Sequence, residues 1–119
     1  MTIEQIAHRL HELVEASNYN QAYDELFAVD AIAKEPQLAE MGLAEVKGIE
    51  SIKGKVQALS AGIASLDERL LSVPIVTDRH IAFTNKVAAT MKDGSQFQLN
   101  EICLYTVENG KIISEEFIY

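Results

Sequence analysis

The chain has 119 residues, enough for one hydrophobic core and too few for two ordinary domains, so residues 1–119 are expected to form a single domain. Its 18 Asp and Glu residues outnumber its 10 Lys and Arg residues, which gives a formal net charge of −8. This surplus argues against nucleic acid and against an anionic membrane surface as partners, because both require a basic patch. The single cysteine excludes an internal disulfide and a multi-cysteine zinc site.

No segment has the features of a membrane span or of a secretory signal. No apolar run approaches roughly 18 residues, the length of a membrane-spanning helix. The first residues also lack a basic stretch followed by an apolar one. We therefore expect a cytoplasmic domain.

Helices are predicted for three segments of the first half. Apolar residues recur there at intervals of three and four, the period that gathers side chains on one helical face. The segments are residues 3–14, 19–27 and 49–66. Asn18 and Gln21 are expected to form the capping box of the second helix.

The stretch between the second and third helices contains a proline. Residues 31–35 are predicted to form a short strand, because the residue before Pro36 is disfavoured in helical conformation. Residues 37–48 have weak periodicity and contain two glycines, so they are expected to form a loop or a lid.

From residue 69 onward the apolar period changes to two, which is typical of strands with one buried face. Turn residues at 77–80, 92–94 and 108–110 divide this half into four strands. The strands are expected near residues 69–77, 80–91, 95–107 and 111–119. The chain is therefore predicted to be an α+β domain with three N-terminal helices packed on a curved, mainly antiparallel sheet.

The last two turns also predict how the strands pair. Three-residue loops would place Asn85 opposite Glu101. They would place Cys103 opposite Glu115. Two-residue turns are the alternative, and they would shift the pairing by one and reverse the faces. With three-residue loops, the inner face carries Phe83, Val87, Ala89, Phe97, Leu99, Cys103, Tyr105, Ile113, Phe117 and Tyr119.

The outer face of the last strands is also apolar in this register. Its apolar residues are Ile102, Leu104, Ile112 and Ile118. An apolar patch on the side of the sheet away from the helices predicts a homodimer that forms sheet to sheet.

Three polar residues interrupt the apolar inner face. Asn85, Glu101 and Glu115 point inward in this register, among apolar neighbours. Burying a carboxylate without a partner is costly, and desolvation raises its pKa. Their convergence beneath helices predicts a pocket filled by water or by a small-molecule ligand. Structural pairing with an arginine such as Arg9 or Arg69 is the alternative.

The element order and three sequence segments resemble the SnoaL-like domains of the nuclear-transport-factor-2-like superfamily, also called the cystatin-like cone. The segments are Ala31–Pro36, Asn100–Ile113 and Ser114–Tyr119. The resemblance covers essentially the whole chain. It implies a conical α+β fold, a pocket between the helices and a concave sheet, and frequent homodimers. Activities in the superfamily range from isomerases, cyclases, epoxide hydrolases and dehydratases to non-enzymatic adaptors.

The residues of ketosteroid isomerase, an enzyme of this superfamily, carry over only in part. Its general base is an aspartate before a proline on the first strand, and Glu35 matches that position. The positions of its two oxyanion donors correspond to Leu10 and, by turn alignment, to Cys103 or its neighbourhood. Steroid isomerisation is therefore not supported. SnoaL-like cyclases place a base on the last strand, where this chain has Glu115 and Glu116.

The candidate catalytic residues are Glu35, Glu101 and Glu115. The candidate ligand contacts are Asn85, Cys103, Tyr105, Phe117 and Tyr119. For Glu35, the alternative is a strand-end residue without chemistry. No metal site is predicted, because the helical phase places His8 opposite the apolar stripe and His11 on its flank, which indicates a solvated face. Cys103 is expected to be a buried structural thiol.

Two functions stay open at this point. One is acid–base chemistry of the isomerase, cyclase or hydratase type on an apolar or carbonyl-bearing ligand, with no cofactor and with Glu35 as the first candidate base. The other is a non-enzymatic homodimer that uses the same fold for ligand sensing or protein interaction.

Overall fold

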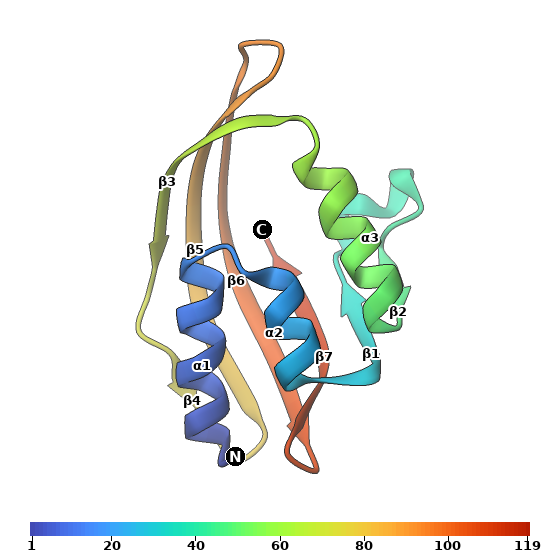
Figure 1. The fold of residues 1–119 in the computed structure, drawn as a ribbon, viewed down its shortest axis with the longest axis vertical. Coiled ribbons are helices and arrows are strands. Elements are labelled where there is room, and N and C mark those ends of the chain that lie inside the picture. Colours follow the sequence, from blue (N-terminus) through green and yellow to red (C-terminus); the bar gives the residue numbers. More distant parts are fainter.

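The computed structural model describes residues 1–119, and its α-helices lie against one side of a sheet (Figure 1). In chain order the elements are α1 (Ile3–Glu15), α2 (Tyr19–Leu26), β1 (Phe27–Lys34), the 3-10 helix η1 (Pro36–Met41), β2 (Glu45–Lys47), α3 (Ile49–Ser60), β3 (Ile63–Leu71), β4 (Ile75–Val76), β5 (His80–Met91), β6 (Gln96–Glu108) and β7 (Lys111–Ile118).

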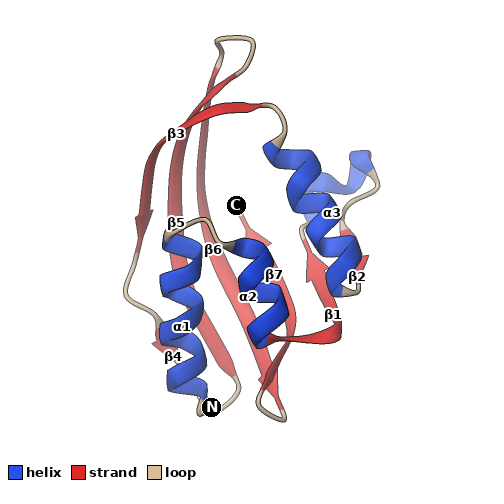
Figure 2. Cartoon of the chain, viewed as in Figure 1, coloured by secondary structure: helices blue, strands red, loops and turns tan.

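The sheet is mixed but mainly antiparallel. Its strand order is β2-β1-β7-β6-β5-β3, and β4 pairs with the beginning of β5. Only β1 and β7 run parallel; the other pairs are antiparallel. Figure 2 shows α1 and α2 in front of the long strands and α3 near β1 and β2, and this arrangement of helices on a sheet confirms the predicted α+β class.

The first two helices form where the apolar period predicts them, but the predicted capping box is wrong. Asn18 makes no side-chain cap hydrogen bond, because its backbone, with ψ at 59°, is not in the extended conformation of a typical N-cap. A capping box occurs instead at the start of α1. Thr2 Oγ1 accepts a hydrogen bond from the Gln5 backbone N–H at 3.1 Å, and Gln5 Oε1 accepts one from the Thr2 backbone N–H at 2.8 Å.

The third helix is shorter than predicted. α3 ends at Ser60, whereas Ile63 and Leu66 lie in β3 and pair with β5. Their spacing suits a helix or a strand, but β5 offers a row of backbone groups whose hydrogen bonds only a strand can satisfy. The expected strand over residues 69–77 is interrupted after Leu71, because Pro74 has no backbone N–H to donate.

The segment over residues 37–48 is not the expected loop or lid. Most of it forms η1 and β2, and β2 pairs antiparallel with β1. β1 itself starts at Phe27, four residues before the expected start at Ala31. β1 pairs with β7, which lies at the far end of the chain, so the spacing of apolar residues around β1 does not predict where this strand starts.

The hairpin of β5 and β6 has the predicted register. Asn85 lies opposite Glu101, and Ala89 lies opposite Phe97. The three-residue turn ends at Gly94, whose φ of +87° is the left-handed conformation that glycine adopts without strain. The inward orientation predicted for Asn85 and Glu101 is therefore confirmed.

The hairpin of β6 and β7 differs from the predicted register by two residues. Tyr105 lies opposite Glu115 rather than opposite Ile113. Asn109 and Gly110 both have positive φ and form a two-residue turn, which shifts the pairing by one. A β-bulge at Ile113 shifts it by one more.

The two shifts have opposite consequences on the two sides of the bulge. Beyond the bulge they restore the original faces, so Glu115 and Phe117 still point inward as predicted. Between the turn and the bulge only the shift of one residue applies, so the inner and outer faces are reversed there. Ile112, expected on the outer face, is completely buried in the core, and Ile113 is not part of that core.

The hydrophobic core fills the space between the sheet and helices α1, α2 and α3. It contains 19 buried residues, and the rings of Tyr23, Phe27 and Tyr105 pack edge to face within it. Five buried residues are polar or charged: Glu35, Lys55, Asn85, Glu101 and Glu115. No helix has the length and apolarity needed to cross a membrane.

Candidate functional site

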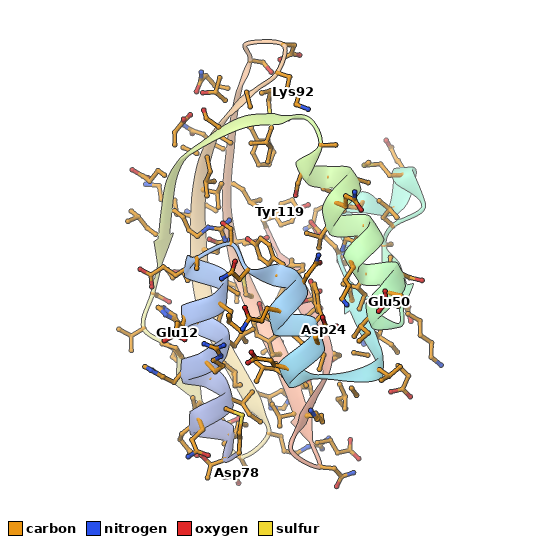
Figure 3. The ribbon with its side chains drawn as sticks, in the orientation of Figure 1. Glu12, Asp24, Glu50, Asp78, Lys92 and Tyr119 are labelled. Carbon is orange, nitrogen blue, oxygen red and sulfur yellow. The ribbon has the colours of Figure 1, made fainter.

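A cavity of about 550 Å³ lies between the helices and the inner face of the sheet. Twenty of its 28 lining residues are hydrophobic. Figure 3 shows Tyr119 in the space between α3 and the long strands. A cavity of this size and polarity is typical of a small-molecule site, in which apolar walls hold the body of a ligand and a few polar groups orient it.

All eight residues singled out from the sequence line this cavity. They are Glu35, Asn85, Glu101, Cys103, Tyr105, Glu115, Phe117 and Tyr119. They come from the end of β1, from β5, β6 and β7, and from the C-terminal residue. The structure therefore brings them together, and the chemical roles assigned to them stay a prediction.

The first polar group of the cavity is the Glu35 cluster, which we define as Glu35, Lys55 and Tyr119. Lys55 Nζ lies 2.9 Å from Glu35 Oε1, and the Tyr119 hydroxyl donates a hydrogen bond to Glu35 Oε2 at 2.6 Å. The Lys55 ammonium also lies 5.7 Å from the centre of the Phe117 ring. Partial burial and the neighbouring Glu35 carboxylate raise the pKa of Tyr119, so its hydroxyl keeps the proton that it donates.

The second polar group is the Arg69 cluster, which we define as Arg69, Tyr19, Asn85 and Glu101. Asn85 Nδ2 donates to Glu101 Oε1 at 3.1 Å, and the Cys103 thiol lies 3.6 Å from the same oxygen. Burial raises the pKa of Glu101, while the Asn85 hydrogen bond and the positive charge of Arg69 act in the opposite direction. The Arg69 guanidinium lies over the Tyr19 ring, 5.3 Å from its centre.

Glu115 stands on β7 and is the most deeply buried carboxyl group of the cavity. The Tyr23 hydroxyl of α2 donates to Glu115 Oε1 at 2.8 Å. Burial raises the pKa of Glu115 to about 7, although the Tyr23 hydrogen bond and the charge of Lys55 lower it. Near neutral pH this carboxyl group is therefore present in both protonation states.

The arginine pairing that offered a purely structural explanation for the inner carboxylates does not occur. Arg9 lies on the surface, where it pairs with Glu12 and Glu25. No ion pair joins Arg69 to a carboxylate. Burial also raises the pKa of the Cys103 thiol, which fits the expected structural thiol and does not favour a nucleophile.

Lys55 and Tyr23 are not among the residues predicted from the sequence. Lys55 stands three residues after Ile52 and four before Leu59, so it belongs to the apolar stripe of α3. A charged residue at an apolar position of the helical period can be identified from the sequence. Tyr23 fits the apolar stripe of α2, and nothing in the neighbouring sequence indicates that its hydroxyl reaches a carboxylate 92 positions away.

The histidines of α1 lie outside the cavity. His8 is exposed, and His11 Nε2 lies 3.0 Å from the Ser72 carbonyl oxygen. The ring of His11 also contacts Phe83 edge to face. The structure contains no group of three His, Cys, Asp or Glu side chains arranged to hold a metal ion.

Comparisons with known proteins agree with this architecture. The family model described as a SnoaL-like domain matches residues 1–119. Among solved structures, the chain is similar to a candidate SnoaL-like polyketide cyclase from Mesorhizobium loti, with 29% identity over 100% of both chains and a TM-score of 0.86. No curated protein sequence matches the chain.

Two further solved structures share the fold at lower identity. A nuclear-transport-factor-2-like protein of unknown function from Burkholderia pseudomallei is 16% identical over 98% of this chain and 88% of its own, with a TM-score of 0.80. A protein with a cystatin-like fold from Xanthomonas campestris is 16% identical over 99% of this chain and 90% of its own, with a TM-score of 0.74.

Proposed function

The chain belongs to the SnoaL-like domain family, and we propose that its cavity binds an apolar small molecule with a carbonyl group and moves a proton to or from it. The observation that carries this proposal is the mainly apolar cavity of about 550 Å³ into which three buried carboxyl groups converge. A carbonyl compound with acidic neighbouring protons suits such a site, because its reaction needs an acid and a base and no group transfer.

We assign the proton transfer first to Glu115. A pKa of about 7 lets this carboxyl group accept a proton and release it at neutral pH. The Tyr23 hydroxyl holds Oε1, which orients the carboxyl group and leaves Oε2 without a hydrogen bond. Oε2 is therefore the oxygen available for a ligand proton.

Glu35, the first candidate base from the sequence, fits a supporting role better. Both of its oxygens are engaged, one by Lys55 and one by Tyr119. Neither oxygen is therefore free to take a proton from a ligand unless Lys55 or Tyr119 moves away. In this proposal Glu35 holds Lys55 in place, and the Lys55 charge stabilises negative charge that develops on the ligand oxygen.

Hydrogen–deuterium exchange tests the proposal directly. The probe is 2-tetralone, a bicyclic ketone with acidic protons next to its carbonyl, followed by proton NMR in D₂O. We expect the protein to accelerate the exchange, and Glu115→Gln to lower that acceleration by about 100-fold, because general acid–base groups contribute 10²–10⁴-fold. Gln keeps an acceptor for the Tyr23 hydroxyl, so the variant should fold.

Glu116→Gln is the matched control, since Glu116 neighbours Glu115 on β7 and lies opposite Leu104 outside the cavity lining. It should exchange 2-tetralone protons at the wild-type rate. Equal rates for Glu115→Gln and wild type would remove Glu115 from the chemistry. No acceleration by the wild-type protein would contradict proton transfer from this class of ketone.

A non-enzymatic homodimer is the second candidate function, and the outer face of the sheet supports it. Ile102 and Ile118 lie opposite each other on β6 and β7 and are 46% and 43% exposed. Light scattering after size-exclusion chromatography measures the mass in solution. A dimer that Ile102→Lys converts to a monomer would support this surface as the interface, and a monomeric wild-type protein would contradict it.

A further inference from the structure

Arg69 is a cation on the cavity wall, and two of its three guanidinium nitrogens have no hydrogen-bond partner. Its Nε and Nη1 atoms are shielded from solvent and have no hydrogen-bond partner. No carboxylate oxygen lies within ion-pair distance of its guanidinium. A guanidinium stays protonated at all accessible pH values, so its charge cannot be relieved by losing a proton. Buried donors without a partner cost free energy, so a ligand group that accepts their hydrogen bonds would be stabilised there.

A second unpaired atom lies nearby on the next strand. Arg69 on β3 pairs in register with Val87 of β5, and Asn85 stands two residues further along the same face of β5. Asn85 Nδ2 is held by Glu101, but Asn85 Oδ1 is buried and has no hydrogen-bond partner. The Arg69 cluster therefore offers unpaired donors and one unpaired acceptor on a single stretch of the cavity wall.

The surroundings of the cluster are apolar. Leu66, Val87, Phe97 and Leu99 line the same cavity on strands β3, β5 and β6. A ligand that reaches Arg69 must therefore present an apolar body together with one group that accepts hydrogen bonds. A negatively charged oxygen group is the strongest such acceptor for a guanidinium.

We propose that the cavity takes a carbonyl compound that also carries an anionic oxygen group, such as a carboxylate, and that this group binds Arg69. This inference rests on the proposed function, since it names the ligand class of the same cavity. Arg69 would select the ligand and orient its carbonyl end toward Glu115 and Lys55.

The charges of the cavity are compatible with one added anion. Lys55 neutralises Glu35 across 2.9 Å. Burial raises the pKa of Glu115 to about 7, so this carboxyl group repels an incoming anion less than a fully ionised carboxylate would near neutral pH. Arg69 forms no ion pair, so its charge is available to an anionic ligand.

A matched pair of probes tests the inference with the full chain. 2-Naphthoate and 2-naphthamide have the same ring system, and only the first carries a negative charge. Calorimetric titration near neutral pH should show 2-naphthoate binding about tenfold more tightly or better. Arg69→Met should remove that preference and leave 2-naphthamide binding within about twofold of wild type.

Arg79→Met is the control for the loss of one positive charge, because Arg79 pairs with Glu108 on the surface. It should leave the affinities of both probes unchanged. Arg69→Lys is the second variant if Arg69→Met does not fold; it should keep a preference for 2-naphthoate, because it keeps the charge.

Each result decides between distinct conclusions. Equal affinities of the wild-type protein for the two probes would overturn the anion site while the cavity proposal stands. An equal loss of both probes in Arg69→Met would do the same, since Arg69 would then act on packing alone. Failure of both probes to bind would contradict the anion site and the proposed ligand cavity together.

Discussion

The two polar clusters of the cavity use buried charge in opposite ways. In the Glu35 cluster one carboxylate oxygen forms an ion pair with Lys55 Nζ, which makes no directed hydrogen bond, and the other accepts a hydrogen bond from the Tyr119 hydroxyl. In the Arg69 cluster the guanidinium has two buried nitrogens without partners, and Asn85 has a buried oxygen without one. The clusters also belong to opposite halves of the sheet, since β1 and β7 are separated from β5 and β3 by β6.

The difference separates two reasons for polar groups inside a protein. In a paired cluster each charge stabilises the other, and removing one partner destabilises the fold because the other charge is left buried without a counter-ion. An unpaired cluster lowers the stability of the free protein and is retained where a ligand completes it. Substitutions in either cluster test this difference, because they are expected to change the free energy of unfolding in opposite directions.

The largest effect is expected from Lys55→Met, which removes the only cation paired with Glu35. The side chains of both residues are almost fully buried, so the uncompensated Glu35 charge should lower the free energy of unfolding by about 3–5 kcal/mol. Urea denaturation measures this change.

Lys53→Met on the same helix is the control for that substitution. Lys53 pairs with Asp24 and Glu50 at the surface, where ion pairs contribute at most about 1 kcal/mol. Equal losses in the two variants would show that the Glu35 cluster is not a buried structural pair.

A pH effect of somewhat smaller size is expected from Glu115, which belongs to neither cluster. Folding raises the pKa of Glu115 from 4.5 to about 7 because the carboxyl group is buried. The folded protein therefore binds a proton that the unfolded chain releases, so the free energy of unfolding falls as pH rises from 4.5 to about 7. A shift of this size corresponds to roughly 3 kcal/mol.

Urea denaturation of wild type and Glu115→Gln at about pH 5 and about pH 8 isolates this contribution, because all other groups are shared. The wild-type protein should lose more stability than the variant between the two conditions. Parallel pH profiles would mean that the pKa of Glu115 is close to its ordinary value.

Arg69→Met should act in the opposite direction from Lys55→Met. Arg69 is half-buried, and its shielded Nε and Nη1 have no hydrogen-bond partner, so an apolar side chain of similar length removes a desolvation cost. The free protein should gain about 1–2 kcal/mol. The thermal unfolding midpoint without ligand measures the gain. A clear loss of stability would place Arg69 among the structural residues and would erase the contrast between the clusters.

The smallest effect is expected from Tyr119→Phe, which removes one hydrogen bond from Glu35. The Tyr119 side chain is 43% exposed, so water can replace its hydroxyl, and the loss should be about 1 kcal/mol. Differential scanning calorimetry resolves such a change. A loss as large as that of Lys55→Met would show that the tyrosine, and not the lysine, holds the Glu35 carboxylate.

Local patterns were sufficient for the element types and for the first long hairpin. The inward positions of Asn85 and Glu101 follow from a period of two and a turn that ends in glycine. The second hairpin shows the limit of that reasoning. Glu115 points inward as predicted, although the register differs from the prediction. The two-residue turn and the bulge at Ile113 each shift the pairing by one residue, and a total shift of two leaves each side chain on its original face.

The partners of the inner carboxylates could not be read from the chain in the same way. Tyr23 reaches Glu115, and Lys55 reaches Glu35, across separations that no periodicity encodes. Lys55 was recognisable as a charge at an apolar phase of its helix, but its partner depends on how that helix crosses the end of β1. Helix placement is decided by packing, which involves the whole core at once.

The sequence by itself determined a small acidic α+β domain with carboxyl groups on the inner face of its sheet. The spacing of apolar residues, the turn residues and the composition depend on a few neighbouring positions, so they predict element types and the faces of strands. The tertiary structure alone decided which charges are paired and which are left open, because pairing depends on distances between segments far apart in the chain. In the folded protein Glu35 forms an ion pair with Lys55, whereas Arg69 forms none.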